Sequence, residues 1–252
     1  MKQSTLIENI LSKDNLNNAY LQVVRNKGAA GVDGMEYKAL LSHLRKNGEQ
    51  IKESIRNQTY KPMPVKRVEI PKEDGSKRKL GIPTVTDRTI QQAVAQVLTP
   101  IYEEKFHDNS YGFRPQKSAQ QAVLKAVEYM NEECNWIVDI DLEKFFDTVN
   151  HDKLISILNK EIKDGKILSL IRKLLVSGVM VGTQVKETEM GTPQGGNLSP
   201  LLANVYLNEF DWEFHRRGVP CIRYADDIVL LAKSERAAQR LLESSTKHLE
   251  ET

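Results

Sequence analysis

Two adjacent aspartates, Asp226 and Asp227, interrupt an apolar stretch near the end of this chain, in the sequence CIRYADDIVLLA. Like charges side by side repel each other and gain nothing from burial. They therefore form either an ordinary turn between two strands or a site that binds something positive. The apolar runs on both sides predict two strands that hold the turn rigidly against a core.

A second acidic strand lies upstream, in the stretch WIVDIDLEKFFD of residues 136–147. Strand alternation places Ile137, Asp139 and Asp141 on one face, which is not the pattern of ordinary core. Carboxylates from separate strands can converge on one spot only if a cation neutralises them. Magnesium fits, because it takes hard oxygen ligands and keeps positions open for water and phosphate. Two such ions can support an in-line phosphoryl transfer.

Positive charge gathers in residues 56–88, which contain nine lysines and arginines against four aspartates and glutamates. The whole chain has a formal net charge of only +2. A local excess of this kind suits phosphate or nucleic acid, and a solvated face is the ordinary alternative. Within it, residues 65–83 read as a β-hairpin with a turn at Asp74 and Gly75. Four basic residues flank that turn: Lys72, Lys77, Arg78 and Lys79.

Hydrophobic periodicity predicts the remaining elements. We expect helices at about residues 6–25, 37–57, 87–105, 118–133, 150–162, 167–175, from 199 onward and 235–250, and a further strand at 179–185. Asp14 and Asn15 are the expected break in the first helix. Ser199 is the expected cap of its helix, with an apolar stripe at Leu202, Tyr206, Phe210 and Phe214. Helices and strands mix without strict βαβ alternation, so the predicted fold class is α+β.

Composition excludes several classes of protein. The 252 residues, 40% of them hydrophobic, allow one large domain or two small ones. Cys134 and Cys221 lack CxxC spacing, so neither a disulfide framework nor a zinc site is expected. The chain starts without a secretory signal, and no apolar run approaches the roughly 18 residues that span a bilayer. A protein of the reducing cytosol is the prediction.

The motifs DLEKFFDTVNH, GTPQGGNLSP and YADD, in that order, resemble the palm of reverse transcriptases. Four upstream stretches narrow the resemblance to the bacterial group II intron-encoded reverse transcriptase, or maturase: KGAAGVDG, IPKEDGSKRKLGIP, TDRTIQQAV and SYGFRP. Seven motifs in the right order leave chance matching negligible. The resemblance runs from about residue 20 to about residue 245, which is nearly the whole chain.

The resemblance implies a right-hand polymerase fold, with an antiparallel palm sheet backed by helices. Fingers are expected at about residues 1–90 and 152–190, and palm at about 91–151 and 191–252. The family pattern continues past YADD into a primer grip and a helical thumb, whereas this chain ends inside the next helix. We therefore expect a truncated unit without a thumb, which binds primer and template weakly.

Metal-binding roles carry over by resemblance to three aspartates. Asp141 matches the first metal ligand of the family, and Asp226 and Asp227 match the YADD pair, with Asp226 holding metal most directly. The Leu142 carbonyl is a further ligand candidate. Asp139 lies on the same face as Asp141 and is its rival. The implied cofactor is Mg²⁺, as two ions, with Mn²⁺ as a substitute.

Nucleotide-binding roles fall on four residues by the same resemblance. Phe146 matches the ring beneath the sugar of the incoming nucleotide, where its bulk clashes with a 2′-hydroxyl. Phe145 is expected in the core instead. Lys72 and Arg78 match the fingers residues that grip the triphosphate. Gln194 resembles the residue beside the incoming nucleotide.

Six further residues are expected to contact nucleic acid: Lys77, Lys79, Arg114, Gly195, Gly196 and Tyr224. The two lysines face template phosphates in this reading, and the glycines let backbone approach the base pair closely. Arg114 either contacts template or braces the palm. Tyr224 either touches the primer end or packs.

The implied function is RNA-directed DNA polymerase of a group II intron, which copies RNA into cDNA from a DNA primer and dNTPs. Its partners are intron RNA and an RNA template, without a membrane, and a homodimer is left open. The protein is expected in a bacterial cytoplasm. The main alternative is a maturase that only binds structured intron RNA. A metal-dependent nuclease would use the same carboxylates but leaves the basic hairpin, Phe146 and TPQGG unexplained.

Overall fold

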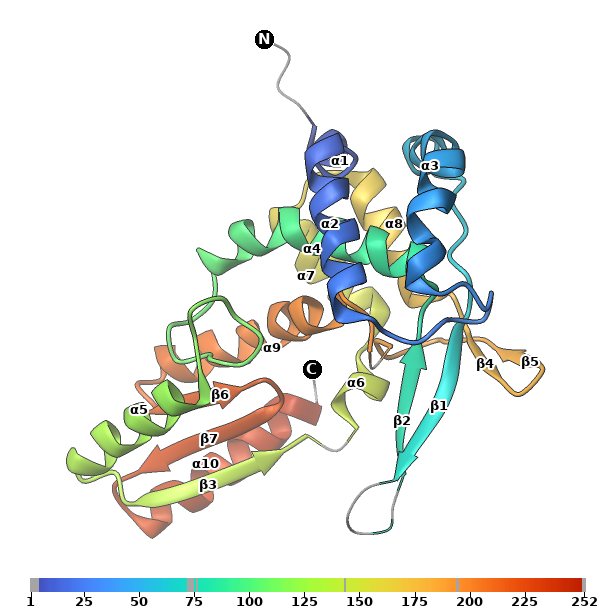
Figure 1. Ribbon diagram of the computed structural model, residues 1–252. Helices are drawn as coiled ribbons and strands as arrows, with labels where there is room; N and C mark the ends of the chain where they lie inside the picture. Colours follow the sequence, from blue (N-terminus) through green and yellow to red (C-terminus); the bar gives the residue numbers. More distant parts are fainter. Residues whose placement is uncertain (1–4, 72–74, 76, 143, 194, 251–252) are drawn as a thin grey trace. The chain divides into compact units, whose positions relative to one another are not determined.

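The computed structural model describes residues 5–71, 75, 77–142, 144–193 and 195–250 (Figure 1). The chain forms two compact units, and each unit is built from two separate stretches. The first unit comprises Met1–Ile101 and Phe146–Ser199, and the second comprises Tyr102–Phe145 and Pro200–Thr252. Each unit has its own sheet and its own helices, so the predicted α+β class is confirmed.

The sheet of the first unit has four strands in the order β2-β1-β4-β5. Their bounds are β1 Val65–Pro71, β2 Lys77–Ile82, β4 Val179–Val181 and β5 Gln184–Lys186. The expected hairpin is β1 and β2, which pair antiparallel, and β1 runs parallel to β4. The single strand expected at residues 179–185 is instead the short hairpin of β4 and β5, because Gly182 adopts φ +61° and reverses the chain.

Helices make up the rest of the first unit. They are α1 Leu6–Ile10, α2 Lys13–Asn26, the 3₁₀ helix η1 Tyr37–Ala39, α3 Leu40–Arg56, most of α4 Val85–Glu103, most of α6 Phe145–Thr148, α7 His151–Glu161 and α8 Gly165–Leu175. The helix expected at residues 6–25 breaks before the expected point. The Ser12 hydroxyl accepts a hydrogen bond from Asn15 N and starts α2, so Asp14 and Asn15 lie in its first turn.

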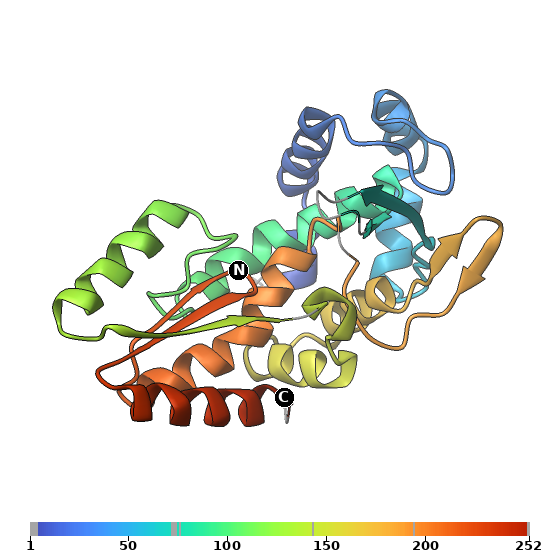
Figure 2. The ribbon, with the colours of Figure 1, turned by 90° about the horizontal axis from the view of Figure 1, so that it is seen from below.

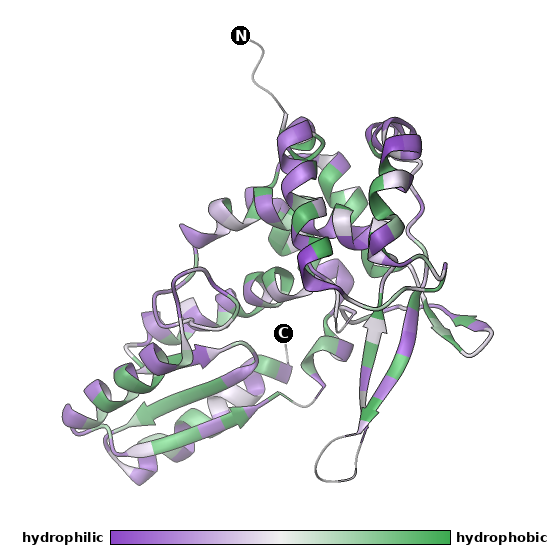
Figure 3. Cartoon of the chain, in the orientation of Figure 1, coloured by the Kyte–Doolittle hydropathy of each residue, from purple (hydrophilic) through white to green (hydrophobic). Residues whose placement is uncertain are grey.

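The second unit is an antiparallel sheet with helices on both faces (Figure 2). Its elements are β3 Trp136–Asp141, β6 Cys221–Tyr224 and β7 Asp227–Ala232, in the order β3-β7-β6, and α5 Ala119–Asn131, α9 Ser199–Arg216 and α10 Glu235–Glu250. One face packs Ile228 and Leu230 against Phe210 and Phe214 of α9. On the other face, Ala122 and Ala126 of α5 pack with Ile222 of β6 and with Val229 and Leu231 of β7. Figure 3 shows that β7, between these layers, is hydrophobic along most of its length.

The apolar stripe expected on the helix after residue 199 is confirmed, because all four of its residues are buried. Ser199 differs from its expected capping position. It is the first residue of α9, and its hydroxyl donates to the Pro193 carbonyl oxygen (2.8 Å), which ties the helix to the preceding glycine-rich loop. Within the described part of the chain, no helix is long and apolar enough to cross a bilayer.

Candidate active site

Acidic side chains gather at one end of the second unit's sheet. The register pairs Asp141 of β3 directly with Asp227 of β7, and Asp139 with Val229. Residues that face each other across an antiparallel pair point to the same side, as do alternate residues along one strand. Asp139, Asp141 and Asp227 therefore share one face. All three side chains are exposed.

The two adjacent aspartates of the opening motif have different backbone positions. Tyr224 pairs with Asp227, so the turn between β6 and β7 consists of only two residues, Ala225 and Asp226. Ala225 adopts φ +61°, a left-handed conformation that is uncommon for a residue with a Cβ atom. Asp227 therefore projects from the strand, while the half-buried Asp226 lies in the turn beside it.

Electrostatics show that these carboxylates lie close enough to repel one another. Partial burial raises the pKa of Asp227, and the negative charges of Asp226, Asp141 and Asp139 raise it further. No lysine or arginine is among the groups that act on it in the described residues. In the same part of the chain, no three His, Cys, Asp or Glu side chains stand close enough together to hold a metal ion. The donor set itself, a group of hard carboxylate oxygens, suits a divalent cation.

The two adjacent phenylalanines in the segment after β3 differ in burial. Phe145 is buried at 7% exposure, and its ring lies 6.1 Å from that of Tyr206, so the expected core position of Phe145 is confirmed. Phe146 is half-buried. The Leu142 carbonyl oxygen accepts a hydrogen bond from Phe145 N (3.1 Å), which leaves its second lone pair for another ligand.

Phe146 lines a polar pocket of about 300 Å³ in the first unit. Lys79 and Arg67 of the basic hairpin line the same pocket, together with Thr192 of the glycine-rich loop. The Thr192 hydroxyl is buried and has no hydrogen-bond partner in the described part of the chain. Arg67 is not among the site residues predicted from the sequence. The register pairs Arg67 with Gly81 and thus puts it on the same hairpin face as Lys79.

The other hairpin residues are distributed differently. Lys77 forms an exposed ion pair with Glu69 (2.8 Å), so its charge is partly neutralised. Lys72 and Gln194 lie outside the described residues. For Arg78 the structure describes only the backbone, which pairs with Ile70 in β1.

Arg114 has the contacts of a bracing residue, one of the two roles left open for it. Its guanidinium donates to the Glu103 carboxylate and to the carbonyl oxygens of His107 and Ser110. It also lies 5.2 Å from the centre of the Phe106 ring. The side chain is buried and its described donors face protein groups, which favours the bracing role.

The remaining predicted residues lie in both units. Gly195 has φ +107°, and a Cβ there would lie 2.8 Å from the Gly81 carbonyl oxygen. A Cβ on Gly196 would meet the Gln91 side chain at 2.9 Å. The close approach that these glycines permit is therefore to the protein's own chain. Tyr224 is 41% exposed on the same sheet face as Asp227, so it is not a core residue.

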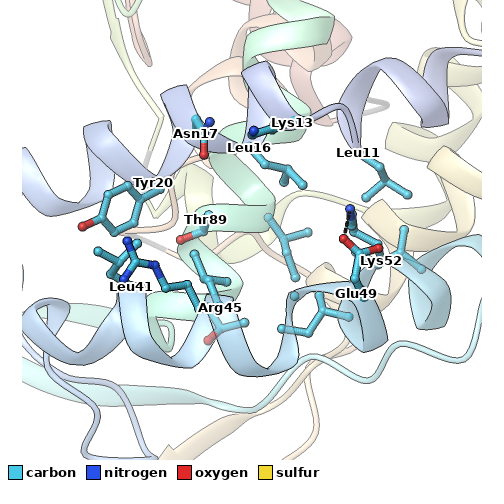
Figure 4. A pocket seen from close by; sticks show the side chains of 16 residues that line it. Leu11, Lys13, Leu16, Asn17, Tyr20, Leu41, Arg45, Glu49, Lys52 and Thr89 are labelled. Carbon is cyan, nitrogen blue, oxygen red and sulfur yellow. Dashed lines mark ion pairs between the residues drawn. The ribbon is translucent and has the colours of Figure 1, made fainter.

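A larger pocket of about 630 Å³ lies between α2 and α3 of the first unit (Figure 4). Leu16 and Leu44 contribute to its mainly apolar lining. Lys13 and Arg45 also line it, and Lys52 pairs there with Glu49. None of the predicted site residues lines this pocket, so it is not part of the candidate active site.

Known proteins that are similar to this chain show the family to which it belongs. Residues 70–252 match the family model described as reverse transcriptase (RNA-dependent DNA polymerase). This chain belongs to the reverse transcriptase family. The right-hand fingers and palm fold expected from the motifs agrees with that membership.

Curated relatives of this reverse transcriptase include group II intron proteins. It is 43% identical over 194 residues to the group II intron-encoded protein LtrA of Lactococcus lactis subsp. cremoris, an alignment that covers 77% of this chain and 32% of LtrA. It is 33% identical to Protein YkfC of Escherichia coli (strain K12), over 84% of this chain and 66% of YkfC. The expected resemblance to group II intron-encoded reverse transcriptases is confirmed. The chain spans about a third of the length of LtrA and just under two thirds of the length of YkfC.

Solved structures share the fold of this reverse transcriptase. A chain of a partial Cas6-RT-Cas1–Cas2 complex superposes with a TM-score of 0.61 at 26% identity, covering 99% of this chain and 42% of that one. Telomerase from Candida albicans superposes with a TM-score of 0.54 at 13% identity, over 75% of this chain and 40% of that one. The second likeness is one of fold alone.

Proposed function

We propose that this protein is an RNA-directed DNA polymerase of a group II intron, which copies RNA into cDNA from a DNA primer and dNTPs. The observation that carries the proposal is the pairing of Asp141 with Asp227, beside Asp226 in the adjoining turn, on an open sheet face. Membership of the reverse transcriptase family supports the same chemistry. In this proposal the second unit acts as the palm and the first as the fingers.

Asp141, Asp226 and Asp227 would hold two Mg²⁺ ions, with Mn²⁺ as a substitute, and the free lone pair of the Leu142 carbonyl would add a ligand. Reverse transcriptases as a family use divalent metals. When bound, such ions activate an attacking oxygen and stabilise a leaving one. The exposed aspartate side chains can rotate toward a shared ion, which would relieve their mutual repulsion.

The first unit would bind the nucleotide and template. Lys79 and Arg67 outweigh the single acid Asp147 in their pocket, and this positive charge suits phosphate. The half-buried ring of Phe146 in the same pocket would exclude a 2′-hydroxyl. Lys72, Arg78 and Gln194 keep their proposed nucleotide-binding roles through the family motifs alone. Gly195 and Gly196 would shape the loop that approaches the base pair. In the second unit, the exposed Tyr224 would touch the primer end.

Intron RNA is the further partner that we propose, through a maturase role supported by the similarity to LtrA. The two bacterial relatives support a bacterial origin and, with it, action in the cytoplasm. A second candidate function is RNA binding in splicing without polymerisation. The retained Asp141, Asp226 and Asp227 favour polymerisation, because RNA binding alone requires no clustered acids.

A primer-extension assay on an RNA template, with dNTPs and Mg²⁺, tests the proposal. Asp141→Asn should lower extension by more than about 100-fold, since losing even an outer-shell partner of a metal costs about 10- to 100-fold. Asp139→Asn is the matched control and should retain extension, because Asp139 lies opposite Val229 and not opposite an acid.

Two outcomes would revise the proposal. If Asp139→Asn abolished extension and Asp141→Asn retained it, Asp139 would be the metal ligand in place of Asp141. No extension by the wild type, together with tight binding of intron RNA, would favour the splicing function alone.

A further inference from the structure

Arg223, two residues before Ala225, has a fully buried guanidinium in the second unit. It donates to the Asp211 carboxylate through Nε (2.9 Å) and Nη2 (2.6 Å). Nη2 also reaches Ser110 Oγ (2.7 Å). Nη1 donates to Asn204 Oδ1 and to the carbonyl oxygen of Ala225, both at 2.8 Å. One side chain thus connects α9, the loop before α5 and the acidic turn.

The position of Arg223 in the sheet is unusual for a charged residue. It pairs with Ile228, so its side chain leaves the sheet on the face opposite Asp227 and enters the layer of α9. A buried ion pair contributes little net stability, and a well-packed apolar pair is often as stable. The planar fork of arginine, however, can hold several acceptors at fixed angles, which an apolar side chain cannot do.

The acceptor of interest is the Ala225 carbonyl. Ala225 has φ +61°, a conformation that persists in a residue with a Cβ only where its surroundings enforce it. The hydrogen bond from Arg223 orients the peptide group that joins Ala225 to Asp226. The direction of that peptide group decides where the side chain of Asp226 leaves the turn.

A second contact holds the same turn from another side. A Cβ atom on Gly112 would overlap the backbone nitrogen of Ala225, so the two backbones pack directly together. Asn204 donates from Nδ2 to the Gly112 carbonyl oxygen (2.9 Å) and accepts from Arg223 at Oδ1. Asn204 therefore links the Gly112 segment to the guanidinium, and the turn is enclosed by one connected network.

We propose that Arg223 is a positioning residue, whose guanidinium holds the Ala225 carbonyl and thereby sets the direction in which Asp226 and Asp227 present their carboxylates. Its effect on DNA synthesis rests on the proposed polymerase function. Its effect on the turn does not, and can be measured without any substrate or metal.

The test variant is Arg223→Met combined with Asp211→Leu, which removes the buried pair without leaving a lone charge. The matched control is Arg114→Met with Glu103→Leu. It removes another buried arginine and its carboxylate from the same unit. Arg114 reaches the Arg223 network only at the Ser110 carbonyl among the described hydrogen bonds, and none of them reaches residues 224–227. Hydrogen–deuterium exchange is followed in the peptide of residues 222–229, and thermal melting reports folding.

We expect exchange in this peptide to become about tenfold to a hundredfold faster in the test variant, since a hydrogen bond from a charged donor is lost. The control should leave it unchanged. Unchanged exchange in a folded test variant, or the same increase in the control, would overturn the proposal. If the test variant does not fold, Arg223→Lys replaces it. Lysine keeps a charge for Asp211 but cannot reach all four acceptors, so exchange should still rise, and no rise would be equally decisive.

Primer extension then separates this inference from the proposed function. A positioning role predicts that kcat falls by about 10- to 100-fold while KM for dNTP is unchanged, because a misplaced group acts on the reacting step. Faster hydrogen–deuterium exchange with an unchanged kcat would overturn the proposal that Arg223 positions the two aspartates. A wild type that extends no primer even at high concentrations of protein and primer–template would contradict the polymerase, while the exchange result would still decide the role of Arg223 in the turn.

Discussion

Adjacent residues of one type have different environments at two points in this chain. Phe145 packs in the core while its neighbour Phe146 lines a polar pocket, and Asp227 projects from a strand while Asp226 lies in a turn. A short helix follows β3, and successive helical residues point in directions about 100° apart, which separates the rings. The residue type alone therefore does not decide the role of either neighbour.

The two phenylalanines give a prediction at the residue scale. Phe146→Val should lower the discrimination against ribonucleotides by about 10- to 200-fold, the range that steric selection in a pocket supplies. Single-nucleotide incorporation with dNTP and rNTP measures this ratio. Phe145→Ala is the control. It should cost about 3–5 kcal/mol of unfolding free energy and leave the ratio unchanged. Loss of discrimination in the control alone would reverse the two assignments.

At the scale of elements, the basic residues of the β1–β2 hairpin have two different environments. Lys79 lines the pocket with Arg67, whereas Lys77 is paired with Glu69. If Lys79 contacts phosphate, Lys79→Ala should lower the slope of log K against log salt by about one for RNA binding. Lys77→Ala should change the slope less, since Glu69 offsets its charge. Binding titrations at several salt concentrations measure both, and equal slopes in the two variants would contradict the distinction.

Periodicity in the sequence predicted most elements because it records which side chains are buried. The helix at residues 235–250 and the hairpin at 65–83 were correct, as was the alternation that put Asp139 and Asp141 on one face. Periodicity does not say which strands pair or in what register. The pairing of Asp141 with Asp227 and the place of Arg67 in a pocket therefore appear only in the structure.

Arg223 was missed for a related reason. It interrupts the apolar alternation of CIRY, and a charged residue at an inward position is the signal that could have identified it. Its partners Asp211 and Ser110 are far away in the sequence, so the network could not be read from local pattern. The close approaches of Gly112 to Ala225 and of Gly195 to Gly81 are likewise tertiary contacts. A glycine in the sequence permits such a contact but does not predict it.

At the scale of the whole molecule, stability depends on a buried carboxyl group in the first unit. Burial raises the pKa of Asp87, although the side chain accepts hydrogen bonds from Thr84 Oγ1 (2.6 Å), Tyr60 Oη (2.7 Å) and Met63 N (3.2 Å). The folded state thus binds the Asp87 proton more tightly than the unfolded state does. The resulting stabilisation is fully present below the unfolded pKa and is lost as pH rises through the folded pKa.

A pair of denaturation curves tests this linkage. The unfolding free energy of the wild type, relative to that of Asp87→Asn, should increase as the pH falls from about 7 to about 4. The hydrogen bonds that asparagine fails to accept weaken the variant at every pH, so only the trend with pH matters. Urea unfolding at several pH values measures it. A difference that is constant, or that grows with rising pH, would contradict the role of Asp87.

For the molecule as a whole, we propose that RNA-templated DNA synthesis depends on the carboxylates at the β3–β7 pair and its adjoining turn. The most direct measurement is primer extension on an RNA template by the wild type and by Asp226→Ala, with Mg²⁺ and dNTPs, alongside RNA binding by each. We predict that the wild type extends the primer, that chelation of Mg²⁺ stops it, and that Asp226→Ala binds RNA equally but extends nothing. Equal extension by the two proteins would contradict the proposed role of these carboxylates.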